Sequence, residues 1–100
     1  MKPLLLCAQG RCQLSGAAVF SQLDELSKKL LIEARKAEDL VLDLKQVSDC
    51  DSAFVALLTA CLQIKSQQQK SLSLANSPRK LLAMLEVYHL QESGLRISGV

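Results

Sequence analysis

A nearly unbroken apolar stretch in the middle of the chain limits the possible folds more than any other feature. Val41-Leu42-Asp43-Leu44 is typical of a short strand in a covered sheet. Ser48-Asp49-Cys50-Asp51-Ser52 follows as a short acidic loop, in which Asp51 or Ser52 can supply an N-cap oxygen. Residues 53–64 then form a helix whose apolar arc spans roughly 200°, twice what a surface helix needs. The sequence therefore predicts a strand, a loop and an apolar helix at the centre of an α/β fold.

This helix is apolar on more than one face, so it must be covered either twice within its own domain or partly by another protein. One stripe is expected against the sheet: Ala53, Leu57, Ala60, Cys61 and Ile64. The arc is extended by Phe54, Val55, Leu58 and Leu62. Because 100 residues leave little material for a second covering layer, we predict that these four bind a partner; a deep core helix is the alternative. Lys65 is expected to keep its charged head in water.

The remaining elements predict a single domain over residues 1–100, with a small mixed sheet of about four strands and about three helices. Helix one is expected to begin near Ser21, with Asp24 completing a capping box. Its buried face is expected to consist of Leu23, Leu26, Leu30 and Ala34, widened by Phe20 and Leu31. Helix three is expected to follow Ser77 as N-cap and Pro78 as its first residue. Strands are expected at residues 3–8, 11–15, 40–44 and 71–75, and a further short strand or turn in the tail. Residues 65–70 are a polar exit from the apolar helix, either a loop or a frayed helix end.

Composition excludes several classes of function. The net charge is only +2, the basic residues are scattered along the chain, and the chain has only three aromatic residues. Nucleic-acid binding is therefore not expected. No apolar run reaches the ~18 residues that span a bilayer, so we expect no direct membrane insertion. The leucines at positions 4–6 are too few for a signal peptide and are interpreted as a first strand. We therefore predict a cytoplasmic protein.

The cysteines do not predict a metal site. Cys7, Cys12, Cys50 and Cys61 form no C-x-x-C pair, and the one histidine, His89, lies far from them in sequence. If Gln9-Gly10 is a two-residue turn, Cys7 and Cys12 face each other across a hairpin. Oxidation could bridge them, but in the cytosol both are expected to stay reduced.

No catalytic constellation is visible, and we predict a protein that is not an enzyme and needs no cofactor. The four glycines are isolated, and a Ser-His-Asp triad would have to use His89 without a supporting motif. Asp49 and Asp51 are expected to cap rather than to hold a metal. The remaining chemical group is the Ser52 hydroxyl at the start of the apolar helix. A phosphate there would meet free N–H groups and add roughly −1.5 to −2 charges; alternatively, Ser52 only hydrogen-bonds locally.

The strand at 41–44, the stretch Val47-Ser48-x-x-Asp51-Ser52 and the apolar helix together resemble the central motif of STAS domains, the fold of the anti-sigma factor antagonists. Leu14-Ser15-Gly16 and Asn76-Ser77-Pro78 match in place, and residues 81–90 look most like the MlaB-type branch that serves phospholipid-transporting ABC systems. The resemblance implies that Asp51 and Ser52 are the functional pair beside a docking helix. It differs from the antagonists at Ala53, where their phosphorylated serine commonly stands, and at Phe54, where they have glycine.

Three hypotheses follow from this resemblance. The first is a non-enzymatic subunit that binds the ATPase of an ABC-type phospholipid transporter and, through it, the membrane permease, peripheral to the inner membrane. It would use Ser52 as a central polar contact, and Phe54→Asp would abolish docking without unfolding the chain. The second is an anti-sigma factor antagonist regulated by phosphorylation of Ser52. The third is a nucleotide- or lipid-sensing domain, which would need a ligand pocket.

Overall fold

A computed structural model describes residues 2–88 and 95–98 and has the predicted order of elements, with a fifth strand added in the tail. The elements are β1 (Leu4–Ala8), β2 (Arg11–Ala18), the 3₁₀ turn η1 (Phe20–Gln22), α1 (Leu23–Arg35), β3 (Leu40–Cys50), α2 (Ser52–Gln68), β4 (Leu72–Ala75), α3 (Arg79–Val87) and β5 (Arg96–Ser98). His89 lies outside the described residues. Within the described residues, no helix is both long and apolar enough to cross a membrane.

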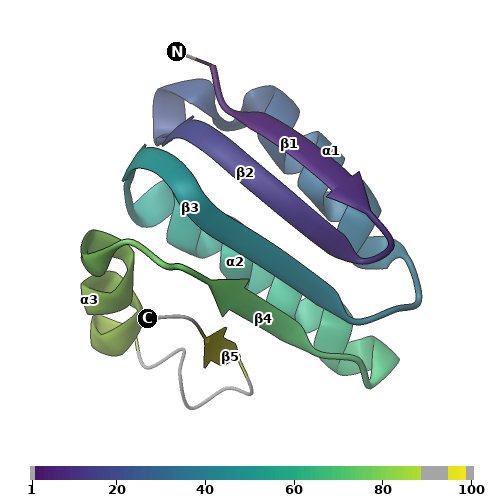
Figure 1. The fold of residues 1–100 in the computed structure, drawn as a ribbon. Helices are drawn as coiled ribbons and strands as arrows, with labels where there is room; N and C mark the ends of the chain where they lie inside the picture. Colours follow the sequence, from purple (N-terminus) through teal and green to yellow (C-terminus); the bar gives the residue numbers. More distant parts are fainter. Residues whose placement is uncertain (1, 89–94, 99–100) are drawn as a thin grey trace.

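The strands form one mixed sheet in the order β1-β2-β3-β4-β5. β1 and β2 are antiparallel, and each later neighbour is parallel, as the strand–helix–strand pattern predicts. α1 and α2 lie side by side behind the sheet in Figure 1, and α3 packs against α2. The predicted α/β class is therefore confirmed, with a sheet of five strands.

The β1–β2 hairpin has the predicted two-residue turn. Gln9 and Gly10 both have positive φ, 52° and 79°, as a type I′ turn requires. The turn places Cys7 opposite Cys12, as predicted, with their Cα atoms 4.0 Å apart. The two sulfurs are bonded to each other in the structure, so the expectation of reduced thiols is wrong here: the register faces the side chains toward each other at bonding distance.

The predicted acidic loop at residues 48–52 is mostly strand, because β3 continues to Cys50. β2 is also longer than predicted, and the two strands stay paired from Arg11↔Val41 to Ala18↔Cys50. Gly16 has a positive φ of 90° but lies within β2, next to a register shift, and not in a turn. The sequence pattern predicted too short a strand, because the second half of β3 is mostly polar. Backbone pairing with β2, and not burial of side chains, extends the strand to Cys50.

The helix starts differ from the expected caps. η1 precedes α1, and Ser21 makes no capping hydrogen bond, although Leu23, Leu26, Leu30 and Ala34 are buried as predicted. α3 has Pro78 as its N-cap, one residue later than expected. Such shifts of one or two residues are usual at helix ends. The core-facing sides of the helices were therefore predicted better than their ends.

For residues 65–70, the alternative of a helix end is confirmed and that of a loop is wrong up to Gln68, whereas the prediction for Lys65 is wrong. The helix continues to Gln68, and Gln69 ends it in the left-handed conformation, with φ 59°. Lys65 is fully buried and not solvated: its Nζ donates to the carbonyl oxygens of Lys36 at 2.7 Å and Glu38 at 2.6 Å. Burial lowers the Lys65 pKa. The ammonium is buried because it satisfies carbonyl groups at the carboxyl end of α1, where a positive charge is favourable.

Candidate partner-binding site at the start of α2

The site lies where the parallel strands β2 and β3 end and α2 begins. Asp51 is the N-cap of α2, and its Oδ1 accepts a hydrogen bond from the Ala53 N–H at 3.0 Å. Its Oδ2 accepts from the Phe20 N–H in η1 at 2.9 Å. Of the two caps predicted, Asp51 is therefore the one used, and its carboxylate holds the end of β2 against the start of α2.

Ser52 is the first residue of α2, and its side chain is exposed. Within residues 2–88 and 95–98, its hydroxyl makes no hydrogen bond to the protein. Local hydrogen bonding, the simpler interpretation of Ser52, is therefore not what the structure has. The hydroxyl is free to contact a partner or to accept a modification.

Asp49 and Lys80 form an ion pair beside this site. Lys80 Nζ lies 3.0 Å from Asp49 Oδ1. The hydrogen bond from Lys80, aided by the Cys50 N–H, lowers the Asp49 pKa, and the same pair raises the Lys80 pKa. A cation in the first turn of α3 is unfavourable for the helix dipole. The pair supplies Lys80 with an acidic partner from the chain itself.

The four apolar residues predicted to bind a partner are part of the protein's own core. Phe54 is 0 % exposed, and Val55, Leu58 and Leu62 are at most 8 % exposed. The physical reason is that α1 contacts α2, α3 also contacts α2, and the sheet lies on a further side. The alternative of a deep core helix is therefore correct, and Phe54→Asp is expected to unfold the protein.

The surface that α2 does expose is small and uncharged. It follows one helical stripe that ends at Ser66 and Gln67. We call the part of this stripe before Ser66 the outer stripe: Ser52, Ala56, Thr59 and Gln63. Phe20 is 77 % exposed and joins this surface at its amino end, because its N–H binds the Asp51 cap. The sequence interpretation missed Phe20, which it assigned to the buried face of helix one. The 3₁₀ geometry of η1 breaks the α-helical phase on which that assignment depended.

A hollow of about 220 Å³ lies beside η1 at this end, lined by Lys2, Ser21, Gln22 and Glu25 among others. Two further candidate binding features lie elsewhere. A hollow of about 350 Å³ on the sheet is lined by Leu6, Arg11, Gln13 and Asp43 among others. There Arg11 Nη2 lies 3.5 Å from Asp43 Oδ2, so these charges are already paired with each other. Cys7, Cys12 and Glu33 form a cluster at the opposite end of β2 from Ser52.

The fold and this site together define a STAS-like domain: a mixed sheet whose β3 leads through an Asp-Ser pair into the central helix. A family model described as "Mlab, STAS domain" matches residues 7–97, and the chain belongs to this family. No curated protein sequence matches the chain. STAS domains are typically regulatory and interaction domains and not enzymes.

Solved structures show the same fold. An anti-sigma-factor antagonist (STAS) domain protein from Planctomyces limnophilus is 18 % identical, with a TM-score of 0.74 over 98 % of this chain and 91 % of the other. A putative anti-sigma factor antagonist from Thermotoga maritima is 16 % identical, with a TM-score of 0.77 over 95 % and 84 %. The anti-sigma factor antagonist SpoIIAA, in its unphosphorylated form, is 12 % identical, with a TM-score of 0.70 over 98 % and 88 %.

Proposed function

We propose that the protein is a non-enzymatic STAS subunit that binds and supports the ATPase of an ABC-type phospholipid transporter. The observation that carries this proposal is the exposed Ser52 directly after the Asp51 cap, beside an exposed Phe20. The family model's MlaB description supports the transporter branch. Through the ATPase the subunit would contact the membrane permease and lie in the cytoplasm at the inner membrane.

The contact surface in this proposal is the outer stripe together with Phe20. Ser52, Ala56 and Thr59 have short side chains and no charge, so another backbone can approach α2 closely without burying an unpaired ion. Phe20 supplies an aromatic anchor of the type that dominates many interfaces. Ser52 supplies the polar contact at the centre, and Asp51 fixes the positions of both.

The test is a pull-down of the tagged protein from its native host. Wild type should recover an ABC ATPase and a membrane permease. Ser52→Asp should lose both, because it places an unpaired carboxylate in the contact. Ser66→Asp, the same change at an exposed position near the other end of α2, should keep both. Equal far-UV circular dichroism of the variants shows that folding is intact; recovery of the ATPase by Ser52→Asp would refute the docking surface.

The second candidate is an anti-sigma factor antagonist controlled by phosphorylation, favoured by the exposed and unbonded Ser52 hydroxyl. Ser52→Ala separates the two candidates. In the transporter proposal it removes a contact and weakens binding, whereas in the antagonist proposal it removes the phosphate acceptor and leaves the protein permanently able to bind. Recovery of a small serine kinase that transfers phosphate to wild type but not to Ser52→Ala would establish the second candidate.

A further inference from the structure

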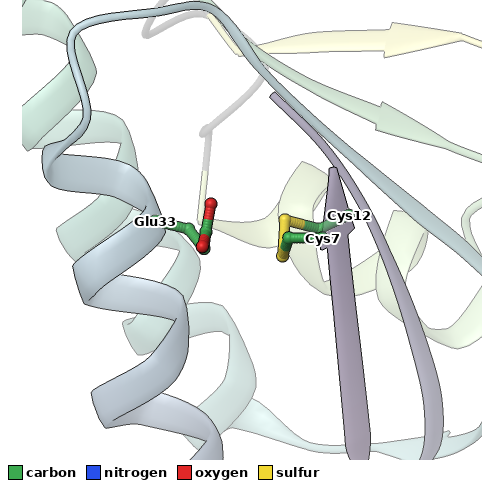
Figure 2. A group of neighbouring side chains, drawn as sticks. All are labelled: Cys7, Cys12 and Glu33. Atoms are coloured by element: carbon green, nitrogen blue, oxygen red, sulfur yellow. A yellow bond between two sulfur atoms is a disulfide. The ribbon is translucent and has the colours of Figure 1, made fainter. Parts of the chain in front are cut away.

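Three potential metal ligands converge between the β1–β2 hairpin and α1. The side chains of Cys7, Cys12 and Glu33 point toward one another in Figure 2. Two sulfur atoms and one carboxylate oxygen all lie within 4.8 Å of each other. The three residues come from three different elements, β1, β2 and α1. This convergence of soft and hard ligands is independent of the Ser52 surface.

The backbone fixes this arrangement. The two-residue turn places Cys7 opposite Cys12, and Cys12 is fully buried beneath the helices. Glu33 stands beside Ala34, a buried residue of α1, so its carboxylate reaches the hairpin from the edge of the core-facing side and is only 19 % exposed. Lys36 Nζ lies 2.9 Å from Glu33 Oε1, which leaves the second carboxylate oxygen for a ligand.

We propose that the reduced protein binds Zn²⁺ at Cys7, Cys12 and Glu33, and that the disulfide and the zinc site exclude each other. A dithiol reductant donates two electrons and two protons to the disulfide; its own thiols form a disulfide, and Cys7 and Cys12 become thiols. Zn²⁺ then displaces the two thiol protons to solvent and is held by two thiolates and the carboxylate, with water as fourth ligand. The bonded sulfurs of the oxidised form offer no thiolate.

The geometry of the cluster suits this coordination. Two thiolates bound at about 2.3 Å from a tetrahedral zinc lie roughly 3.8 Å apart. On reduction the two bonded sulfurs must separate to this distance, and the Glu33 carboxylate oxygen already lies within 4.8 Å of both. A hollow of about 200 Å³, lined by Leu5, Cys7, Lys29, Ile32 and Glu33, gives the metal and its water a path from solvent.

The surrounding charges support a bound dication. Two thiolates and a carboxylate carry three negative charges, and Zn²⁺ leaves one of them uncompensated. Lys36 is paired with Glu33, and Lys29 lines the same hollow. A hydrogen bond from a neighbouring group to a ligating carboxylate is the usual support of such ligands. The metal would therefore link α1 to the hairpin, which the disulfide alone does not do.

The test is a zinc titration of the full chain, reduced with a phosphine under anaerobic conditions, against a chromophoric chelator. Reduced wild type should bind one Zn²⁺ per chain, and Co²⁺ should give thiolate charge-transfer bands with tetrahedral visible bands. Protein with the disulfide intact should bind none. Glu33→Gln should weaken binding by more than the roughly 10- to 100-fold that loss of a supporting outer group costs.

Matched variants separate this site from adventitious thiol binding. Glu25→Gln, an exposed carboxylate on the same helix, should leave the affinity unchanged, as should Cys61→Ala, which removes one of the two other thiols. Cys7→Ser should abolish the cobalt charge-transfer bands. A zinc-dependent rise of the melting temperature of reduced wild type gives a second readout that needs no variant. Equal affinity of wild type and Glu33→Gln, or no binding by reduced wild type, would overturn the proposal.

Discussion

The same substitution at the two phenylalanines of the chain distinguishes a core position from a docking position. Phe54 is 0 % exposed and Phe20 is 77 % exposed. Truncating a buried phenylalanine costs about 3–5 kcal/mol of unfolding free energy. For a domain of this size, each kcal/mol lowers the melting temperature by roughly 4–8 °C. Phe54→Ala should therefore melt about 12–40 °C below wild type.

Phe54→Asp adds an unpaired buried carboxylate to this loss, so its total cost should approach the about 5–15 kcal/mol that stabilises a typical domain. We expect no cooperative thermal transition for it in far-UV circular dichroism. Phe20→Asp should stay within about 0.5 kcal/mol of wild type, as exposed substitutions usually do. A melting temperature of Phe54→Asp within a few degrees of wild type would refute the burial argument.

Phe20 is also predicted to carry binding energy if the proposed docking surface is correct. An aromatic anchor typically contributes about 2 kcal/mol or more, which corresponds to roughly 30-fold weaker binding of the ATPase by Phe20→Ala. Surface plasmon resonance with the purified ATPase measures this change. Phe20→Ala with wild-type affinity and wild-type stability would remove Phe20 from the interface.

Two further predictions concern charged groups within the fold. Lys65→Met should lower the unfolding free energy by about 2–4 kcal/mol in urea titrations, because the carbonyl groups of Lys36 and Glu38 lose the donor that Lys65 buries against them. Lys70→Met, an exposed control, should change it little, and an equal effect of both would contradict the argument. Asp43 has its pKa lowered from 3.8, first by the Asn76 side chain and then by the Lys45 N–H. At acidic pH the Asp43 carboxyl therefore binds fewer protons in the folded protein than in the unfolded chain. Its contribution to stability is complete above about pH 4 and is lost as the pH falls through the lowered pKa. Asp43→Asn should flatten this acid-side slope of the unfolding free energy; an unchanged slope would assign it to other carboxylates.

Local signals in the sequence were enough to predict most of the fold. Asp51 was recognisable as a cap because an acidic residue before an apolar run satisfies free helix N–H groups. The Gln9-Gly10 turn fixed the register that faces Cys7 to Cys12. Period-two and helical patterns were enough to predict the order of strands and helices along the chain and the buried side of α1. In each case, the information lay within a few consecutive residues.

The errors arose where distant segments decide the outcome. The sequence pattern of α2 shows how much of the helix surface is apolar, but not which other elements cover it. Phe54 and Leu62 were assigned to a partner for this reason, whereas α1 and α3 cover the helix in the structure. Lys65 is a surface residue by type and is buried only because carbonyl groups from the α1–β3 connection surround it. Both outcomes depend on contacts between residues far apart in the chain.

The Asp51 carboxylate gives the proposed docking surface its order before a partner arrives. One oxygen caps α2 and the other binds the N–H of Phe20, so a single side chain sets the spacing between the exposed hydroxyl and the exposed ring. A surface that is already ordered loses less conformational freedom on binding. The substitution Asp51→Asn would keep one acceptor oxygen, but the side chain could no longer accept both hydrogen bonds through separate oxygens. The aspartate before Ser52 would therefore matter for docking without touching the partner.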